Sequence, residues 1–273
     1  MEQPVALVTG ASSGFGREIV LELIDKGYIV CGAARRVEKM ADLEGIGVRV
    51  LALDITDDAS VQTCVAEVLR REGRIDVLVN NAGYGAFGAV EEVLPAEARR
   101  QFDVNVFGLA RLTQLVIPAM RSQRSGVIVN ITSVAGRICP PFGAWYAAAK
   151  HAVEALSDGL RYELKPFGIH VVVIEPGMFK TGWDAIALAS LRKTSGSGPY
   201  AADANRVAEG MAVYYDSPLL SHPRAVARVV GHAVTAANPK TRYVVGRGAG
   251  LLLFAKALLP DKAYDFLARL VMR

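Results

Sequence analysis

Cysteine and long apolar runs are both scarce in this sequence of 273 residues. The three cysteines, Cys31, Cys64 and Cys139, are scattered and form no C-x-x-C pair, which argues against a disulfide framework or a zinc site. We therefore expect no metal, and thiols that serve as small buried apolar groups. No apolar run reaches the roughly 18 residues of a membrane-spanning helix, and the longest late stretch, 251–259, stops at Pro260.

Charge of one sign is not concentrated in any segment. The 31 lysines and arginines and 27 acidic residues leave a net charge of +4 and no dense basic stripe, which excludes nucleic acid as the expected partner. The first ten residues contain no basic segment followed by a long apolar run, so we expect no signal peptide and a cytoplasmic location. A hydrophobic fraction of 52% indicates a large folded core.

Short apolar segments alternate with amphipathic helical segments along most of the chain. This order predicts right-handed crossovers and a Rossmann-like, doubly wound α/β fold, with a parallel sheet of about seven strands and helices on both faces. We expect one domain over 1–273. The expected strands are 5–9, 28–33, 48–53, 76–80, 127–132, 169–174 and 242–245. The expected helices include 57–71, a continuous segment 96–121, 144–165, 201–216 and 223–237.

The pattern loosens after Gly177. We expect 178–220 to cover a substrate, with a flexible loop at 193–199, and 248–273 to form a C-terminal extension. Three hypotheses apply to this extension: it packs on a partner subunit, shields the substrate pocket, or lies on a membrane surface. Packing against the chain's own core is favoured over all three, although lysines such as Lys262 would suit anionic headgroups.

A turn rich in glycine and serine links the first expected strand to the first helix. Gly10 permits a sharp turn, Gly14 permits close approach of a pyrophosphate, and Gly16 permits tight packing of the helix. Open amides at the start of the helix then face an anion. The sequence therefore predicts a dinucleotide site, with further contacts from Ser12, Ser13 and Phe15.

The glycine spacing after Thr9, G-x-x-x-G-x-G, resembles that of the short-chain dehydrogenase/reductase family. Other motifs support the resemblance over about residues 4 to 182: Asn80-Asn81-Ala82-Gly83, Ser133, the Y-x-x-x-K of Tyr146 and Lys150, and Pro176-Gly177 with Thr181. The resemblance implies an NAD(P)-dependent oxidoreductase. It also implies that Asn81, Ala82, Gly83, Pro176, Gly177 and Thr181 contact the cofactor.

The end of the second expected strand favours NADP(H) over NAD(H), with NAD(H) as a second option. An NAD enzyme usually has an acidic residue at this point, whereas this chain has Arg35 and Arg36. A guanidinium can pair with a 2′-phosphate, and the resemblance implies that Ser13 assists Arg35. Asp54, with Ile55, resembles the family's adenine contact; the alternative is that Asp54 caps the next turn.

Tyr146 and Lys150 are four residues apart in an expected helix and share one face. We expect Tyr146 to be the general acid or base, with its pKa lowered by the Lys150 ammonium and by the positive nicotinamide ring of the oxidised cofactor. Ser133 would donate to the carbonyl oxygen. By resemblance, Lys150 also holds the nicotinamide ribose, and Asn105 holds a water behind it.

Substrate contacts are expected from Tyr84, Arg137, Phe142 and Met178, with further walls from Ile138, Pro140 and the segment 179–215. Their mostly apolar character favours a small hydrophobic alcohol or carbonyl compound. The region around 239–243 resembles the hydroxysteroid and retinol dehydrogenase branch, which implies a steroid-like, retinoid-like or other lipid-like substrate. The family resemblance also implies a homodimer or homotetramer. Two alternatives are a nucleotide-sensing regulator, against which the intact Ser133, Tyr146 and Lys150 argue, and a nucleotide-sugar epimerase, which would carry a different glycine spacing.

Overall fold

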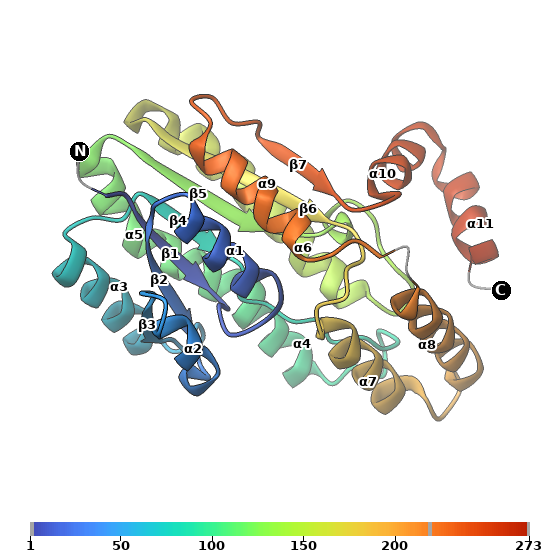
Figure 1. The fold of residues 1–273 in the computed structure, drawn as a ribbon. Coiled ribbons are helices and arrows are strands. Elements are labelled where there is room, and N and C mark those ends of the chain that lie inside the picture. The colour runs from blue at the N-terminus through green and yellow to red at the C-terminus, as the bar shows by residue number, and fades with distance from the viewer. Residues whose placement is uncertain (1–2, 218–219, 272–273) are drawn as a thin grey trace.

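One sheet of seven parallel strands organises the molecule, in the order β3-β2-β1-β4-β5-β6-β7 (Figure 1). The computed structural model describes residues 3–217 and 220–271. The expected doubly wound α/β fold is confirmed, because the strand order runs outwards in both directions from β1 and β4. The strands are β1 (Val5–Thr9), β2 (Ile29–Ala34), β3 (Arg49–Ala52), β4 (Val77–Asn80), β5 (Gly126–Ile131), β6 (Ile169–Pro176) and β7 (Arg242–Val245).

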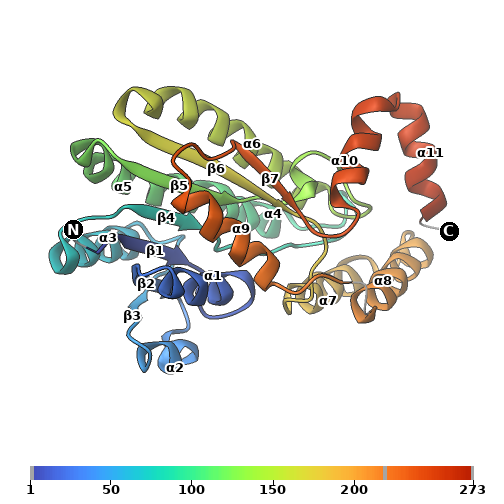
Figure 2. The same ribbon diagram turned by 45° about the horizontal axis from the view of Figure 1, so that its top comes forward.

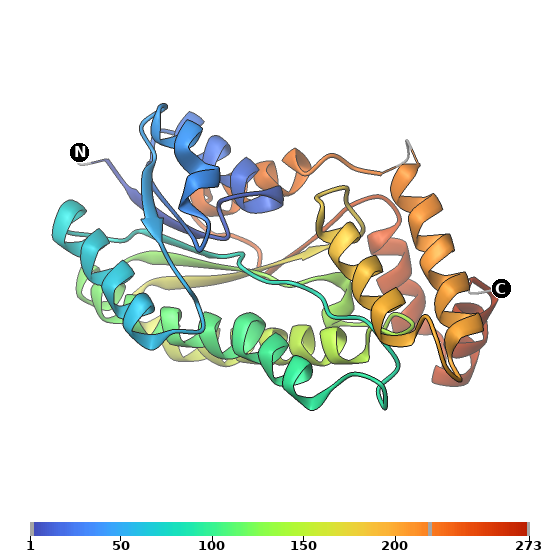
Figure 3. The ribbon, with the colours of Figure 1, turned by 90° about the horizontal axis from the view of Figure 1, so that it is seen from below.

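Helices cover both faces of the sheet, as Figure 3 shows from below. One face packs against α1 (Gly14–Asp25) and α9 (Arg224–Thr235), and the other packs against α3 (Asp58–Glu72), α5 (Leu109–Gln123) and α6 (Ala144–Leu164). All five residues of β1 are buried and supply the two layers alternately: Ala6 and Val8 join the α1 side, and Val5 and Leu7 join the α3 side. A strand with two buried faces needs apolar residues throughout, which explains its unbroken apolar sequence.

The segment expected as one helix over 96–121 is divided into three parts. It consists of α4 (Pro95–Phe102), a π-helical segment η2 (Asp103–Gly108) and α5. At Gly108 an added Cβ would overlap the carbonyl oxygen of Ile55, so the helix can approach the loop after β3 only without a side chain there. Short helices η1 (Val37–Met40) and α2 (Ala41–Glu44), which the sequence pattern did not indicate, follow β2.

The later part of the chain forms helices at one end of the sheet. They are α7 (Trp183–Ser195), α8 (Ala201–Asp216), α10 (Ala249–Leu258) and α11 (Asp261–Val271), and Figure 2 places all four beyond the end of β6. The prediction of a loop over 193–199 was wrong for its first three residues, which belong to α7. Ser195 is fully buried and accepts a hydrogen bond from the amide of Ala89 (2.9 Å), which keeps α7 helical to its end. Within the described residues, no helix is long and apolar enough to cross a membrane.

Candidate active site

A cavity of about 970 Å³ opens along the carboxyl ends of the strands. This is the edge at which open α/β sheets bind ligands. Most of the residues expected from the sequence lie along it: Gly10, Ser12, Ser13, Gly14, Phe15, Arg35, Arg36, Asp54, Ile55, Asn81, Ala82, Gly83, Tyr84, Ser133, Ile138, Pro140, Tyr146, Lys150, Pro176, Gly177, Met178 and Thr181. Four expected residues lie outside its lining: Gly16, Asn105, Arg137 and Phe142.

The turn between β1 and α1 has the form that a phosphate requires. Gly10 has a φ of +68°, and an added Cβ would lie 2.8 Å from Nδ2 of Asn81, which itself donates to the carbonyl of Thr9 (2.8 Å). An added Cβ on Gly16 would overlap the carbonyl oxygen of Gly10, so Gly16 lets α1 approach the turn instead of touching a ligand. The Ser13 side chain makes no capping hydrogen bond, which leaves the first amides of α1 open towards the cavity. These residues fit a dinucleotide.

Two arginines and one aspartate occupy the next strand ends. Arg35 and Arg36 are exposed beside the cavity, and no ion pair to either is found within the described part of the chain. Oδ1 of Asp54 accepts from the amide (3.0 Å) and the hydroxyl (2.7 Å) of Thr56. Partial burial opposes ionisation of Asp54, but these bonds and the Arg35 charge leave its pKa below the usual value. Asp54 therefore shapes its own turn while it lines the cavity.

Ser133, Tyr146 and Lys150 converge at the centre of the cavity. Ser133 follows β5, its Oγ accepts from the amide of Ala135 (3.1 Å), and it shares a side-chain hydrogen bond with Tyr146. Lys150 lies one turn after Tyr146 on α6, with Nζ 5.8 Å from the phenol ring centroid, and donates to the carbonyl of Ile131 (2.9 Å). Ser133 comes from the segment after β5 and the other two from α6, and the packing of α6 on the sheet brings them together.

The pKa values of this group differ from the expectation that Lys150 lowers the pKa of Tyr146. Burial raises the pKa of Tyr146 to about 12, and the Ser133 hydrogen bond opposes this only in part. The Lys150 ammonium is directed to a backbone carbonyl rather than to the phenol oxygen, which accounts for its small influence. Burial lowers the pKa of Lys150 to about 8, and the Glu154 carboxylate opposes that shift. At neutral pH the phenol therefore retains its proton, and the ammonium retains its charge.

Asn105 supports the site from behind the cavity wall. It lies in η2 and is buried. Its Oδ1 accepts a hydrogen bond from the amide of Tyr84 (3.0 Å), and its Nδ2 donates one to the carbonyl of Tyr84 (2.8 Å). A Cβ added to Gly83 would lie 2.9 Å from Oδ1 of Asn105 and 3.8 Å from Nζ of Lys150, so Gly83 brings these two side chains close to one backbone position.

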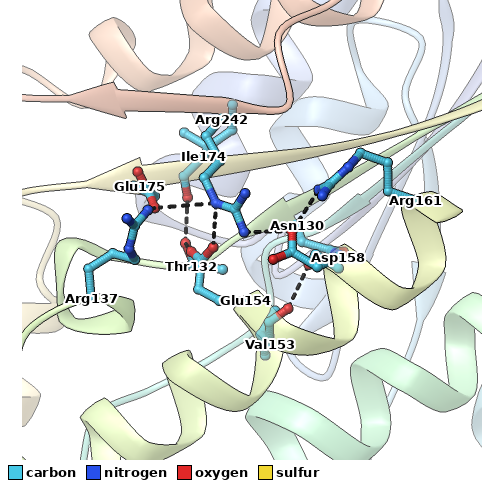
Figure 4. Close-up of polar contacts among 11 residues, drawn as sticks. Asn130, Thr132, Arg137, Val153, Glu154, Asp158, Arg161, Ile174, Glu175 and Arg242 are labelled. Carbon is cyan, nitrogen blue, oxygen red and sulfur yellow. Dashed lines mark hydrogen bonds and ion pairs between the residues drawn. The ribbon is translucent and has the colours of Figure 1, made fainter.

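An ionic network joins α6, the helix that carries Tyr146 and Lys150, to the last strand (Figure 4). Glu154, one turn beyond Lys150, accepts from the hydroxyl of Thr132 (2.6 Å) and pairs with Nε of Arg242 (3.0 Å). Arg242 also reaches Asp158 (2.6 Å) and lies 3.8 Å from the buried carboxylate of Glu175. The sequence contained no spacing that could show this network, because its members come from α6, β6, β7 and the residue that follows β5.

The remaining part of the cavity is aromatic and aliphatic. Trp183 lies 5.1 Å from Tyr146 and 5.8 Å from Phe87, ring centroid to centroid. Further apolar walls come from α7, α8 and α10, namely Ile186, Val207, Met211 and Leu252. Trp183 and Met211 fall in the segment expected to cover the substrate, whereas Phe87 and Leu252 were not singled out from the sequence.

Three residues expected to contact substrate are directed elsewhere. The Tyr84 hydroxyl donates to Glu97 (2.8 Å), which with burial raises the pKa of Tyr84. The Arg137 guanidinium pairs with Glu175 (3.2 Å), and Phe142 packs edge-on against Tyr200 with ring centroids 6.4 Å apart. Among the described residues, no group of three or more metal-ligating side chains is present.

Residues 4–189 match the family described as short chain dehydrogenase, and the chain belongs to this family of oxidoreductases. It is 36% identical to "Probable short-chain type dehydrogenase/reductase VdlC" of Helicobacter pylori, over 98% of this chain and 97% of that one. It is 35% identical to the 3-ketodihydrosphingosine reductase of Bacteroides thetaiotaomicron (99% and 98%). It is 34% identical to the NADPH-dependent 3-dehydrocapnine reductase of Ornithobacterium rhinotracheale (95% and 94%).

Solved structures agree with the fold over nearly the whole chain. A short-chain dehydrogenase from Streptomyces avermitilis superposes with a TM-score of 0.83 at 34% identity, covering 98% of this chain and 96% of that one. A relative from Burkholderia phymatum in complex with NAD has a TM-score of 0.80 at 26% identity (97% and 95%). One from Burkholderia cenocepacia in complex with NADP has a TM-score of 0.77 at 25% identity (98% and 98%).

Proposed function

We propose that this protein transfers a hydride between NADP(H) and a hydrophobic, lipid-like carbonyl or alcohol. The observation that carries the proposal is the division of one cavity into two parts. One part offers the open start of α1 and the Arg35 and Arg36 guanidiniums, and the other is apolar. Tyr146 and Ser133 lie where the two parts meet.

The first part suits the nucleotide. The turn from Gly10 to Phe15 would hold the pyrophosphate, Arg35 with Ser13 would take the 2′-phosphate, and Asp54 with Ile55 would border the adenine. Residues 81–83, Pro176, Gly177 and Thr181 would enclose the nicotinamide end. When bound, the nucleotide supplies or accepts the hydride. NAD(H) remains a second option, since the exposed Arg35 does not exclude a nucleotide that lacks the phosphate.

The proton and the polarisation come from the chain itself. With its pKa raised to about 12, Tyr146 keeps its proton at neutral pH and can donate it from Oη to the substrate oxygen in the reduction direction. The Ser133 hydroxyl, held by the amide of Ala135, donates a second hydrogen bond to that oxygen as negative charge develops. The Lys150 ammonium keeps positive charge behind the phenol, and Asn105 fixes the loop that faces it.

The apolar part suits a substrate with an extended hydrocarbon chain. Trp183, Val207 and Met211 offer it few polar partners, and we propose that residues 178–220 cover it. Two relatives bear names that specify a keto or dehydro group at position 3 of their compounds. These names support a ketone as the group that is reduced, within the lipid-like class that includes steroid-like and retinoid-like carbonyls.

The test is NADPH oxidation with ketones of increasing alkyl chain length, a steroid ketone and retinal. We expect kcat/KM to rise with alkyl length. Tyr146→Phe should reduce turnover by about 100-fold to 10,000-fold, as expected for loss of a general acid, while NADPH still binds. Tyr162→Phe, at an exposed position on α6, is the matched control. Equal turnover by Tyr146→Phe, or no turnover of any carbonyl by the wild type, would reject the proposal.

We also propose that the protein is a cytoplasmic homodimer or homotetramer assembled through the face of α4 and α6. Phe107 of η2, which directly follows α4, is 61% exposed and lines a second cavity together with Phe102 of α4 and Trp145 of α6. Sedimentation velocity of the wild type and of Phe107→Ser tests the assembly: we expect the variant to dissociate, and a monomeric wild type would contradict the proposal.

A further inference from the structure

The apolar part of the cavity contains a buried hydroxyl group that the proposed reaction does not use. It belongs to Tyr215, the penultimate residue of α8, which is 5% exposed and lines the cavity. Ala204, Ala208 and Tyr215 are spaced i, i+4 and i+11, so they share one face of α8. The two alanines belong to the apolar cluster that joins α8 to Ala187 of α7, and Figure 3 shows these two helices side by side. Helix packing therefore holds Tyr215 at the cavity wall.

Three other tyrosines line the cavity, and each differs from Tyr215. The Tyr84 hydroxyl donates to Glu97, and Tyr146 is the proton donor of the proposed reaction. Tyr214 is 37% exposed, so water can reach its side chain. In the described part of the chain, no hydrogen bond to the Tyr215 hydroxyl is found. A buried hydroxyl without a partner costs free energy that a phenylalanine would not, and a ligand that binds the hydroxyl would offset this cost.

The Tyr215 hydroxyl lies near the reacting end of the cavity. Trp183, the first residue of α7, packs beside Tyr146 with ring centroids 5.1 Å apart, and Asp184 follows it in the first turn of this helix. Burial raises the pKa of Tyr215, and the Asp184 carboxylate and the Tyr146 phenol raise it further. Such interactions weaken with distance, so the Tyr215 hydroxyl lies close to both groups. It also keeps its proton at neutral pH.

The surroundings of this hydroxyl determine which group it can bind. A protonated phenol donates its hydrogen bond to a lone pair, which a protonated amine lacks. A carboxylate or phosphate has lone pairs, but the nearby Asp184 charge disfavours a second anion. Oδ1 of Asp184 is itself buried without a partner among the described residues. A neutral hydroxyl suits both neighbours, because its oxygen accepts from the phenol and its proton carries the polarity that a carboxylate favours.

We propose that Tyr215 is a specificity-determining residue, which donates a hydrogen bond to a hydroxyl group that the substrate carries near the reacting carbonyl. The substrate class is then a hydroxy ketone whose remainder is apolar, because Val207 and Met211 form apolar walls around this position. The inference rests on the proposed function, in which Tyr146 and Ser133 bind the carbonyl oxygen of the same molecule.

NADPH oxidation with matched ketones tests the role of Tyr215. One is an octanone, and the others carry a hydroxyl group on the carbon beside the carbonyl or on the next carbon. In the wild type, one of the hydroxy ketones should have the higher kcat/KM. In Tyr215→Phe the ratio of hydroxy ketone to plain ketone should fall by about tenfold, as for loss of one neutral hydrogen bond. Intrinsic reactivity cancels when the two proteins are compared. The loss should appear in KM, because this bond is made equally before and during hydride transfer.

Two measurements separate this role from a structural one. Tyr162→Phe removes a phenol hydroxyl from α6 at a position that is 74% exposed, and it should leave the ratio unchanged. Tyr215→Phe should be at least as stable as the wild type in equilibrium urea unfolding, because it removes a hydroxyl that has no partner in the described part of the chain.

An unchanged ratio in Tyr215→Phe would overturn the proposal, and so would a marked loss of stability in that variant, which would assign the hydroxyl a structural role. A wild type that prefers the amino analogue to the hydroxy ketone would reject the hydroxyl as the recognised group. Turnover of all these ketones at equal kcat/KM would reject the role of Tyr215 and leave the proposed function standing. Absence of turnover with any carbonyl would reject the proposed function. Titration by tryptophan fluorescence would then decide on Tyr215, which should still bind the hydroxy ketone more tightly than the plain ketone.

Discussion

Replacement of Arg242 by methionine tests the ionic network between α6 and the edge of the sheet. The Arg242 guanidinium lies within 4 Å of three carboxylates, of which Glu154 is 8% exposed and Glu175 is 1% exposed. Methionine keeps much of the apolar stem but removes the charge and every hydrogen bond. Two buried carboxylates would then lose a cation that the fold supplies from β7.

The expected loss of stability in Arg242→Met depends on the partners that the two carboxylates keep. Removing one member of a buried ion pair costs about 3–5 kcal/mol in the free energy of unfolding. Glu154 keeps the Thr132 hydroxyl and Glu175 keeps the half-exposed Arg137. We therefore expect the lower end, about 3 kcal/mol, measured by equilibrium urea unfolding at pH 7.5. Arg161→Met removes an i,i+3 pair with Asp158 near the surface and should cost less than about 1 kcal/mol.

The pH dependence gives an independent check. Burial, with the nearby Glu154 charge, raises the pKa of Glu175 above its usual value, and Arg242 opposes that shift. A raised pKa means that the folded protein binds this proton more readily than the unfolded chain, so acidification relieves the cost of the charge. Loss of Arg242 should raise the pKa further, and the deficit of Arg242→Met should shrink from pH 7.5 to pH 5.5. A deficit below 1 kcal/mol, or one that grows on acidification, would refute this account of the network.

Four further outcomes concern the site itself. Reduction should decline as pH rises through about 8, because the pKa of Lys150 lies near that value and its ammonium is lost above it; a flat rate from pH 7 to pH 9.5 would contradict this. Glu154→Gln should move that decline to lower pH, because the Glu154 carboxylate raises the pKa of Lys150. Comparison of the pH–rate profiles of the wild type and the variant measures the shift. Arg35→Ala should weaken NADPH binding by about 1.5–3 kcal/mol, the range for a hydrogen bond to a charged group, and should weaken NADH binding far less. Fluorescence titration measures both affinities, and Arg99→Ala, at an exposed position, is the control. Gly16→Ala should abolish nucleotide binding in the same titration, because its methyl group would displace the turn after β1.

Regular periodicity made much of the fold predictable from the sequence. The last strand, 242–245, was predicted with its observed bounds, and α8 was placed at 201–216, because apolar runs and amphipathic periods are local properties. The turn after β1 was also predictable, since a tight strand-to-helix turn with close backbone contacts requires glycine at fixed positions.

Features that depend on distant contacts were not predictable. The π-helical segment around Asn105 is fixed by hydrogen bonds to Tyr84, 21 residues away, and no local pattern distinguishes it from an α-helix. The helical end of α7 depends on the bond from Ala89 to Ser195. Arg137 was expected beside the substrate, but its guanidinium pairs instead with the buried Glu175 on β6. In each case a partner remote in sequence decides the outcome.

The position of β7 has a consequence for the order in which the protein matures during synthesis. Arg242 brings positive charge to Glu154 on α6, and it follows Glu154 by 88 positions in the chain. A nascent chain that has reached residue 200 holds the complete turn after β1 and Tyr146, yet Glu154 of α6 still lacks its arginine partner. Ribosome-stalled chains should therefore bury the half of the sheet around β1 first, and the half that packs against α6 should become resistant to protease only after β7 has emerged.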